Sequence, residues 1–197
     1  MLAFTPIKIS GRWQDGYALD LQTLNSVYVG DDQYGHARFT THRPPVGDLL
    51  YRLKNSGDTS AVAELAETAA TFVKAWAPPV SAIVPVAPSN PNRVVQPVSL
   101  VGKALAETLG LNWMPDVVKK VKATGQLKDV SDLDERLAIL AGAFSGVHDG
   151  LMGVTVLLFD DLYRSGATMN SISDVLYDEC KADVVYALTL TRTRVNR

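Results

Sequence analysis

Residue types suited to binding an anionic sugar follow one another between residues 154 and 168. The apolar run of residues 154–159 is typical of a strand that is buried on both faces of a parallel sheet. Two carboxylates, Asp160 and Asp161, come next, and a short polar segment containing Gly166 precedes a helical pattern that begins at Met169. A helix N-terminus presents unpaired N–H groups and the positive end of the helix dipole, and both suit a phosphate. We therefore expect this segment to bind an anion.

The side chains of this segment divide between a phosphate and a sugar. Gly166 allows the backbone to approach an anion closely, and Ser165 and Thr168 offer hydroxyl donors, Thr168 being also a candidate N-cap. Asp160 and Asp161 would repel a phosphate, so they are expected to accept hydrogen bonds from sugar hydroxyls or to face a hydrated Mg²⁺. A phosphorylated sugar meets both demands. The alternative is a buried strand that ends in an ordinary turn, with the two acids merely closing the strand.

The run VLLFDDLYRSGAT, residues 156–168, resembles the phosphoribosyl pyrophosphate signature of type I phosphoribosyltransferases. The resemblance implies that Asp160 and Asp161 contact the ribose hydroxyls. It also implies that the 5′-phosphate is held by Tyr163, Arg164, Ser165, Gly166, Ala167 and Thr168. Arg164 stands where the family usually has a small Thr or Ser, so it either adds a phosphate contact or reshapes the pocket.

A second candidate anion site follows the strand predicted over residues 82–86. Pro88, Ser89, Asn90 and Arg93 come after this strand, and the carboxyl ends of parallel strands meet at one edge of a sheet. Both segments are thus expected to approach one ligand. In the family, the corresponding early loop meets pyrophosphate, and the run VPVAPSNPNR resembles the loop of the competence-protein ComF group.

The resemblance to ComF-like proteins extends over residues 49–191 and includes Leu53-Lys54 and Gln126. Two features depart from that group. The arginine-glycine-phenylalanine-asparagine-glutamine block is represented only by RVVQP at residues 93–97, and a hairpin-like region stands in place of the N-terminal zinc module. The chain thus resembles a ComF-like protein without that module, which implies single-stranded DNA as a further candidate partner.

A cluster of lysines flanks the polar segment of residues 124–126. Its members are Lys119, Lys120, Lys122 and Lys128. A basic loop here could close over pyrophosphate and exclude water, and Lys122 is the residue predicted to contact the substrate. The same lysines, with the arginines of residues 192–197, could instead bind a nucleic-acid backbone, or they could form a solvated charged surface.

Composition indicates an ordinary globular protein. The 197 residues are 47% hydrophobic and 20% charged, and the formal net charge of −2 argues against a globally basic nucleic-acid binder. No apolar run approaches the roughly 18 residues of a membrane span, and the first nine residues lack a signal-peptide pattern, so we expect a cytoplasmic protein with no membrane partner. Cys180 is the only cysteine, which excludes an intramolecular disulfide.

The order of elements predicts an α/β fold with a mostly parallel, twisted sheet flanked by helices, which the resemblance identifies as the type I phosphoribosyltransferase fold. Helices are expected over residues 46–53, 58–77, 98–109, 132–140 and 169–180, and strands over 82–86, 113–114, 154–159 and 184–190. Turn signals among residues 8–39 indicate hairpins. A single domain is expected over residues 1–197, with a β-rich hood over 1–45 and an α/β core over 46–197. Trp13, Tyr17, Tyr28 and Tyr34 of the hood could stack on a base or form a small core.

Three functions are consistent with these patterns. The first is a Mg²⁺-dependent phosphoribosyltransferase that moves ribose 5-phosphate from phosphoribosyl pyrophosphate to an unidentified nitrogen acceptor. The second is a non-catalytic protein that binds phosphoribosyl compounds or nucleotides, and the third is a DNA-associated accessory protein of ComF type. By analogy with the family, a homodimer is a further candidate, and the hairpin region could supply its interface.

Overall fold

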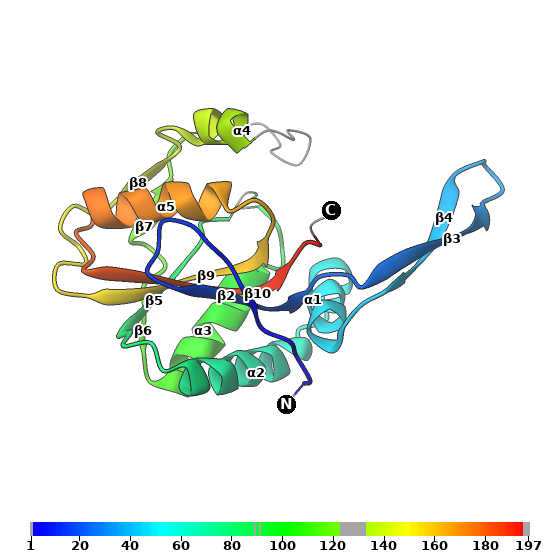
Figure 1. The fold of residues 1–197 in the computed structure, drawn as a ribbon, viewed down its shortest axis with the longest axis horizontal. Helices are drawn as coiled ribbons and strands as arrows, with labels where there is room; N and C mark the ends of the chain where they lie inside the picture. Colours follow the sequence, from blue (N-terminus) through cyan, green and yellow to red (C-terminus); the bar gives the residue numbers. More distant parts are fainter. Residues whose placement is uncertain (1, 89, 91, 123–132, 195–197) are drawn as a thin grey trace.

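The computed structural model describes residues 2–88, 90, 92–122 and 133–194 (Figure 1). Its central sheet has the strand order β1-β2-β10-β9-β5-β6. These strands are β1 (Ile7–Lys8), β2 (Gly16–Leu21), β10 (Val184–Arg192), β9 (Thr155–Tyr163), β5 (Ala82–Pro85) and β6 (Asn112–Trp113). All neighbouring pairs are parallel except β1 with β2. The fold is therefore α/β with a mostly parallel sheet, as the sequence predicted.

Helices cover both faces of this sheet. On one face lie α1 (Pro45–Ser56), α2 (Ala61–Trp76) and α3 (Pro97–Leu109), and on the other lie α4 (Leu133–Leu140) and α5 (Ala167–Asp178) (Figure 1). Side chains of β9 alternate between the two cores: Val156 and Leu158 pack on the α5 side, and Leu157 and Phe159 on the α1 side. Continuing this alternation places Asp160 on the α5 side and Asp161 on the α1 side.

The predicted helices are all present, with ends within three residues of the expected ones. A short antiparallel pair, β7 (Val118–Lys120) and β8 (Phe144–Gly146), was not predicted. Val118 and Phe144 are buried in it. Strands of three residues are too short to show an alternating pattern, so no sequence signal marked them.

The N-terminal region divides between the sheet and a projecting hairpin. Strands β1 and β2 belong to the central sheet, so residue 45 does not mark a boundary of that sheet. In contrast, β3 (Asn25–Asp31) and β4 (Ala37–His42) pair with each other and extend away from the body (Figure 1). Within the described residues, no helix combines the length and the apolar character needed to cross a bilayer.

The aromatic residues of this region accordingly do not form one core. Trp13 is buried, and Tyr17 packs edge-on against Trp76 of α2. Tyr28 and Tyr34 are 54% and 75% exposed on the hairpin. The prediction of a small core is therefore wrong for the hairpin, because both of its faces are open to solvent.

Candidate functional site

The acidic pair lies within a strand and not on a loop. β9 continues past Asp160 to Tyr163, and Thr189 of β10 is the register partner of Asp160. The expectation that the strand stops before the acids was therefore wrong, because β10 extends equally far and continues the pairing. The hydroxyl of Thr191 also donates to the carbonyl oxygen of Asp161 at 3.0 Å. The sheet thus fixes the backbone that carries both carboxylates.

The connection from β9 to α5 is shorter than predicted. Only residues 164–166 separate the two elements, and Gly166 occupies the N-cap position with φ of +78°. Thr168 lies in the first turn of α5, so its prediction as N-cap was wrong. The left-handed backbone at Gly166 turns the chain into the helix two residues earlier than the side-chain pattern suggested. The first-turn N–H groups, which have no partner within a helix, therefore begin next to this connection.

Tyr163 anchors this connection to the N-terminal region. Its hydroxyl donates to the carbonyl oxygen of Ser10 at 3.0 Å, and its ring meets that of Trp13 edge-on at 6.4 Å. The guanidinium of Arg192 lies 5.7 Å from the ring centroid. Burial raises the pKa of Tyr163. The phenol thus stays neutral and positions the connection.

The two carboxylates have different surroundings. Asp161 Oδ1 lies 2.8 Å from Nζ of Lys54 in α1, and the two side chains are only 15% and 17% exposed. The N–H of Asp161 donates to Asp160 Oδ1 at 2.8 Å. Burial and the neighbouring charge of Asp161 raise the pKa of Asp160 to about 8. Burial thus favours the protonated form of Asp160, whereas Asp161 forms an ion pair with Lys54.

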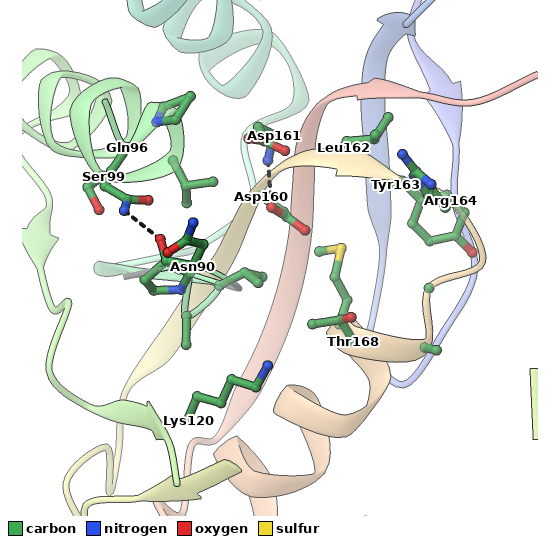
Figure 2. A pocket seen from close by; sticks show the side chains of 18 of the residues that line it. Asn90, Gln96, Ser99, Lys120, Asp160, Asp161, Leu162, Tyr163, Arg164 and Thr168 are labelled. Atoms are coloured by element: carbon green, nitrogen blue, oxygen red, sulfur yellow. Dashed lines mark hydrogen bonds between the residues drawn. The ribbon is translucent and has the colours of Figure 1, made fainter. Parts of the chain in front are cut away.

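A cavity of about 740 Å³ opens beside this pair, and Figure 2 shows side chains that line it. In Figure 2, the acids lie between Asn90, Gln96 and Ser99 on one side and Arg164 and Thr168 on the other. Cationic side chains from four separate segments contribute to its lining: Lys54, Arg93, Lys120 and Arg164. The cavity thus combines two acidic side chains with four cationic ones.

Most of the predicted site residues line this one cavity. They are Pro88, Asn90, Arg93, Asp160, Asp161, Tyr163, Arg164, Ser165, Gly166, Ala167 and Thr168. Lys122 is exposed and is not part of the lining, whereas Lys120 of β7 is. Ser89, Gln126, Lys128 and Arg197 lie outside the described residues.

The loop after β5 is fastened to α1. Gln96 Nε2 donates to the carbonyl oxygens of Asn90 and Arg93 at 2.9 and 3.0 Å, and Arg93 Nη2 donates to the carbonyl oxygen of Lys54 at 3.0 Å. Sequence reasoning named Lys120 only as one of the four lysines that could close over pyrophosphate, did not identify Gln96 as a site residue, and reached Lys54 only through the family resemblance. No spacing could reveal Gln96 or Lys54, because the fold brings them to the acids from other elements.

The site fits Mg²⁺ only as an ion that the protein holds together with a bound substrate. Among the described residues, there is no cluster of three or more His, Cys, Asp or Glu side chains that could hold a metal ion. Mg²⁺ commonly uses one or two carboxylates, with waters and substrate phosphates completing its shell. Asp160 and Asp161 are the residues that could contribute, although Asp161 Oδ1 already faces Lys54.

No protein-family model and no curated protein matches the sequence. Among solved structures, the chain resembles adenine phosphoribosyltransferase from Saccharomyces cerevisiae at 13% identity and a TM-score of 0.45, covering 86% of this chain and 84% of that one. It resembles adenine phosphoribosyltransferase from Thermoanaerobacter pseudethanolicus at 15% identity and a TM-score of 0.45, covering 86% of this chain and 95% of that one. It also resembles orotate phosphoribosyltransferase from Francisella tularensis at 14% identity and a TM-score of 0.40, covering 85% of this chain and 78% of that one. These neighbours do not support a ComF-like subgroup, and the function has to be argued from the cavity itself.

Proposed function

We propose that the chain binds phosphoribosyl pyrophosphate and transfers ribose 5-phosphate to a nitrogen acceptor. One observation carries the proposal: a single cavity places two adjacent carboxylates at the end of β9, the N-terminus of α5 beside them, and cationic side chains around them. A ligand that carries both hydroxyl groups and several phosphates matches this distribution of charge. A plain anion would gain nothing from the acids, and a neutral sugar would gain nothing from the cations.

In this proposal, the residues act mainly by binding and orienting. The first turn of α5 and Ser165 hold the 5′-phosphate, and Asp160 and Asp161 contact the ribose hydroxyls. As the bond between C1 and pyrophosphate breaks, the bonding electrons leave with pyrophosphate, and the acceptor nitrogen forms the new bond to C1. Lys120 would stabilise the charge that develops on pyrophosphate, and Arg164 would add a contact to the 5′-phosphate. Mg²⁺ bound with the substrate would neutralise part of the same charge.

The first experiment is calorimetric titration of the protein with phosphoribosyl pyrophosphate, with and without Mg²⁺. We expect saturable binding at one site that is tighter than binding of ribose 5-phosphate or pyrophosphate alone, because only the complete ligand occupies both halves of the cavity. Binding of pyrophosphate as tight as that of the complete ligand would contradict the sugar site. No binding of any of the three would overturn the proposal.

A second candidate function is binding of phosphoribosyl pyrophosphate without transfer of ribose 5-phosphate. The observation that favours it is the hydrogen bond from Arg93 to the Lys54 carbonyl, because a guanidinium that fastens the loop to α1 is less available to a leaving pyrophosphate. Incubation with phosphoribosyl pyrophosphate and a panel of nitrogenous bases separates the two functions. Base-dependent release of pyrophosphate supports the transferase, and binding without release supports the second candidate. An accessory role with single-stranded DNA rests on the ComF resemblance alone.

A further inference from the structure

Lys54 joins three parts of the cavity that are far apart in the sequence. Its ammonium lies 2.8 Å from Asp161 at the end of β9, and its backbone carbonyl accepts the hydrogen bond from Arg93 in the loop after β5. Lys54 itself lies in the last turn of α1. One residue therefore connects the acidic strand, the loop expected to meet pyrophosphate, and a helix that packs on the opposite side of the sheet from α5.

The ion pair occupies a position where water screens charge poorly. Both side chains are less than one fifth exposed, so the attraction is stronger than in a surface pair. Asp160 is the other titratable neighbour that the structure shows next to Asp161, and its carboxylate would repel that of Asp161 if both were ionised. Lys54 thus offsets the cost of placing two carboxylates side by side.

We propose that Lys54 is a positioning residue for the sugar site: its ammonium fixes the rotamer of Asp161, so that one carboxylate is anchored and Asp160 is left to contact the ribose. This inference rests on the proposed function and assigns different roles to the two acids. It also makes Lys54 the resident counter-cation of the pair. The orientation of Asp161 is then set by the protein before any ligand or metal arrives.

The test is a double-mutant cycle on ligand affinity. Calorimetry would measure phosphoribosyl pyrophosphate binding to the wild type, K54M, D161N and the K54M/D161N double variant. If Lys54 acts through Asp161, K54M weakens binding about tenfold in the wild-type background and less than twofold in the D161N background. K54R, which keeps the charge, should recover part of the affinity, and K74M on the exposed surface of α2 should leave it unchanged.

Other results of the same double-mutant cycle would separate a positioning role for Lys54 from direct ligand contact. If the losses of affinity add in the double variant, Lys54 contacts the ligand directly. If K54M binds the ligand as tightly as the wild type, Lys54 neither contacts the ligand nor positions Asp161. Each of these two results overturns the positioning role. If K54M alone fails to fold, folding of the double variant would support the pair, and K54R then reports on affinity. A wild type that binds none of the phosphoribosyl ligands overturns the proposed function, whereas a wild type that binds normally beside an unchanged K54M overturns only this inference.

Discussion

Tyr163 and Gly166 are in direct contact across the connection that leads from β9 to α5. A Cβ atom built on Gly166 would lie 2.9 Å from both the Tyr163 ring and its hydroxyl oxygen. The ring has little freedom to retreat, because its hydroxyl is bonded to Ser10. Two constraints thus favour glycine at this position: its positive φ, and the contact with Tyr163 that leaves no room for a Cβ atom.

The first prediction separates these two requirements. Gly153 has φ of +75° with nothing within 4 Å of a built Cβ, so G153A tests the backbone strain alone. We expect G153A to cost about 1–2 kcal/mol of unfolding free energy, and G166A to cost clearly more and to weaken phosphoribosyl pyrophosphate binding. Thermal unfolding and calorimetry would measure both. Equal losses of stability in the two variants would show that the Tyr163 contact is soft.

The pH dependence of stability provides the second prediction. Because the pKa of Asp160 is about 8 in the folded protein, the folded state retains a proton that the unfolded state releases near pH 4. The stability contributed by protonated Asp160 is fully present below about pH 4 and is lost as the pH rises through about 8. Relative to D160N, the wild type should therefore lose stability between pH 5 and pH 9.

This loss should reach at least about 1 kcal/mol, or about 2–4 °C in Tm for a chain of this length. The comparison with D160N removes the contributions of titrating groups that do not interact with Asp160, since those are common to both proteins. Parallel Tm curves for the two proteins across this range would contradict the raised pKa. Carbon-13 NMR of the Asp160 carboxyl provides a direct check.

The third prediction concerns two lysines that are two residues apart. Lys120 lines the cavity, whereas Lys122, the residue predicted from the sequence, is exposed outside it. We expect K120M to weaken binding of pyrophosphate and of phosphoribosyl pyrophosphate about tenfold, in line with the loss of one charge-assisted contact of roughly 1.5 kcal/mol. K122M serves as the matched control and should bind both ligands normally. A larger effect of K122M would instead favour the original prediction.

A comparison of the predicted and observed site residues shows which parts of the site the sequence could reveal. The apolar run, the acids and the glycine are adjacent in the chain, so their order alone predicted a strand and a helix with an anion-binding connection between them. Lys54 and Gln96 could not be found in this way, because their approach depends on how α1 and α3 are rotated on the sheet. The strand continued through Asp160 and Asp161 because of pairing with β10, which no local pattern encodes.

The last prediction concerns the hairpin formed by β3 and β4. Its large apolar side chains are exposed, with Tyr28 and Phe39 54% and 57% accessible, and none of its residues lines the cavity. Asn25 and His42 are register partners, so a Gly-Ser-Gly connection can replace residues 26–41 without disturbing the body. We expect this variant to keep its Tm within about 3 °C and its affinity for phosphoribosyl pyrophosphate within about twofold, because little buried apolar area is lost.

Light scattering on the same two proteins tests whether the hairpin is the interface of a homodimer. An isolated two-stranded hairpin is marginally stable in water, and exposed aromatic residues on it are typical of a surface that a partner covers. If the wild type is a dimer and the shortened variant a monomer, the hairpin is the interface. Loss of ligand affinity in a variant that remains folded would contradict the prediction and would show that the hairpin contributes to the sugar site, directly or through the dimer.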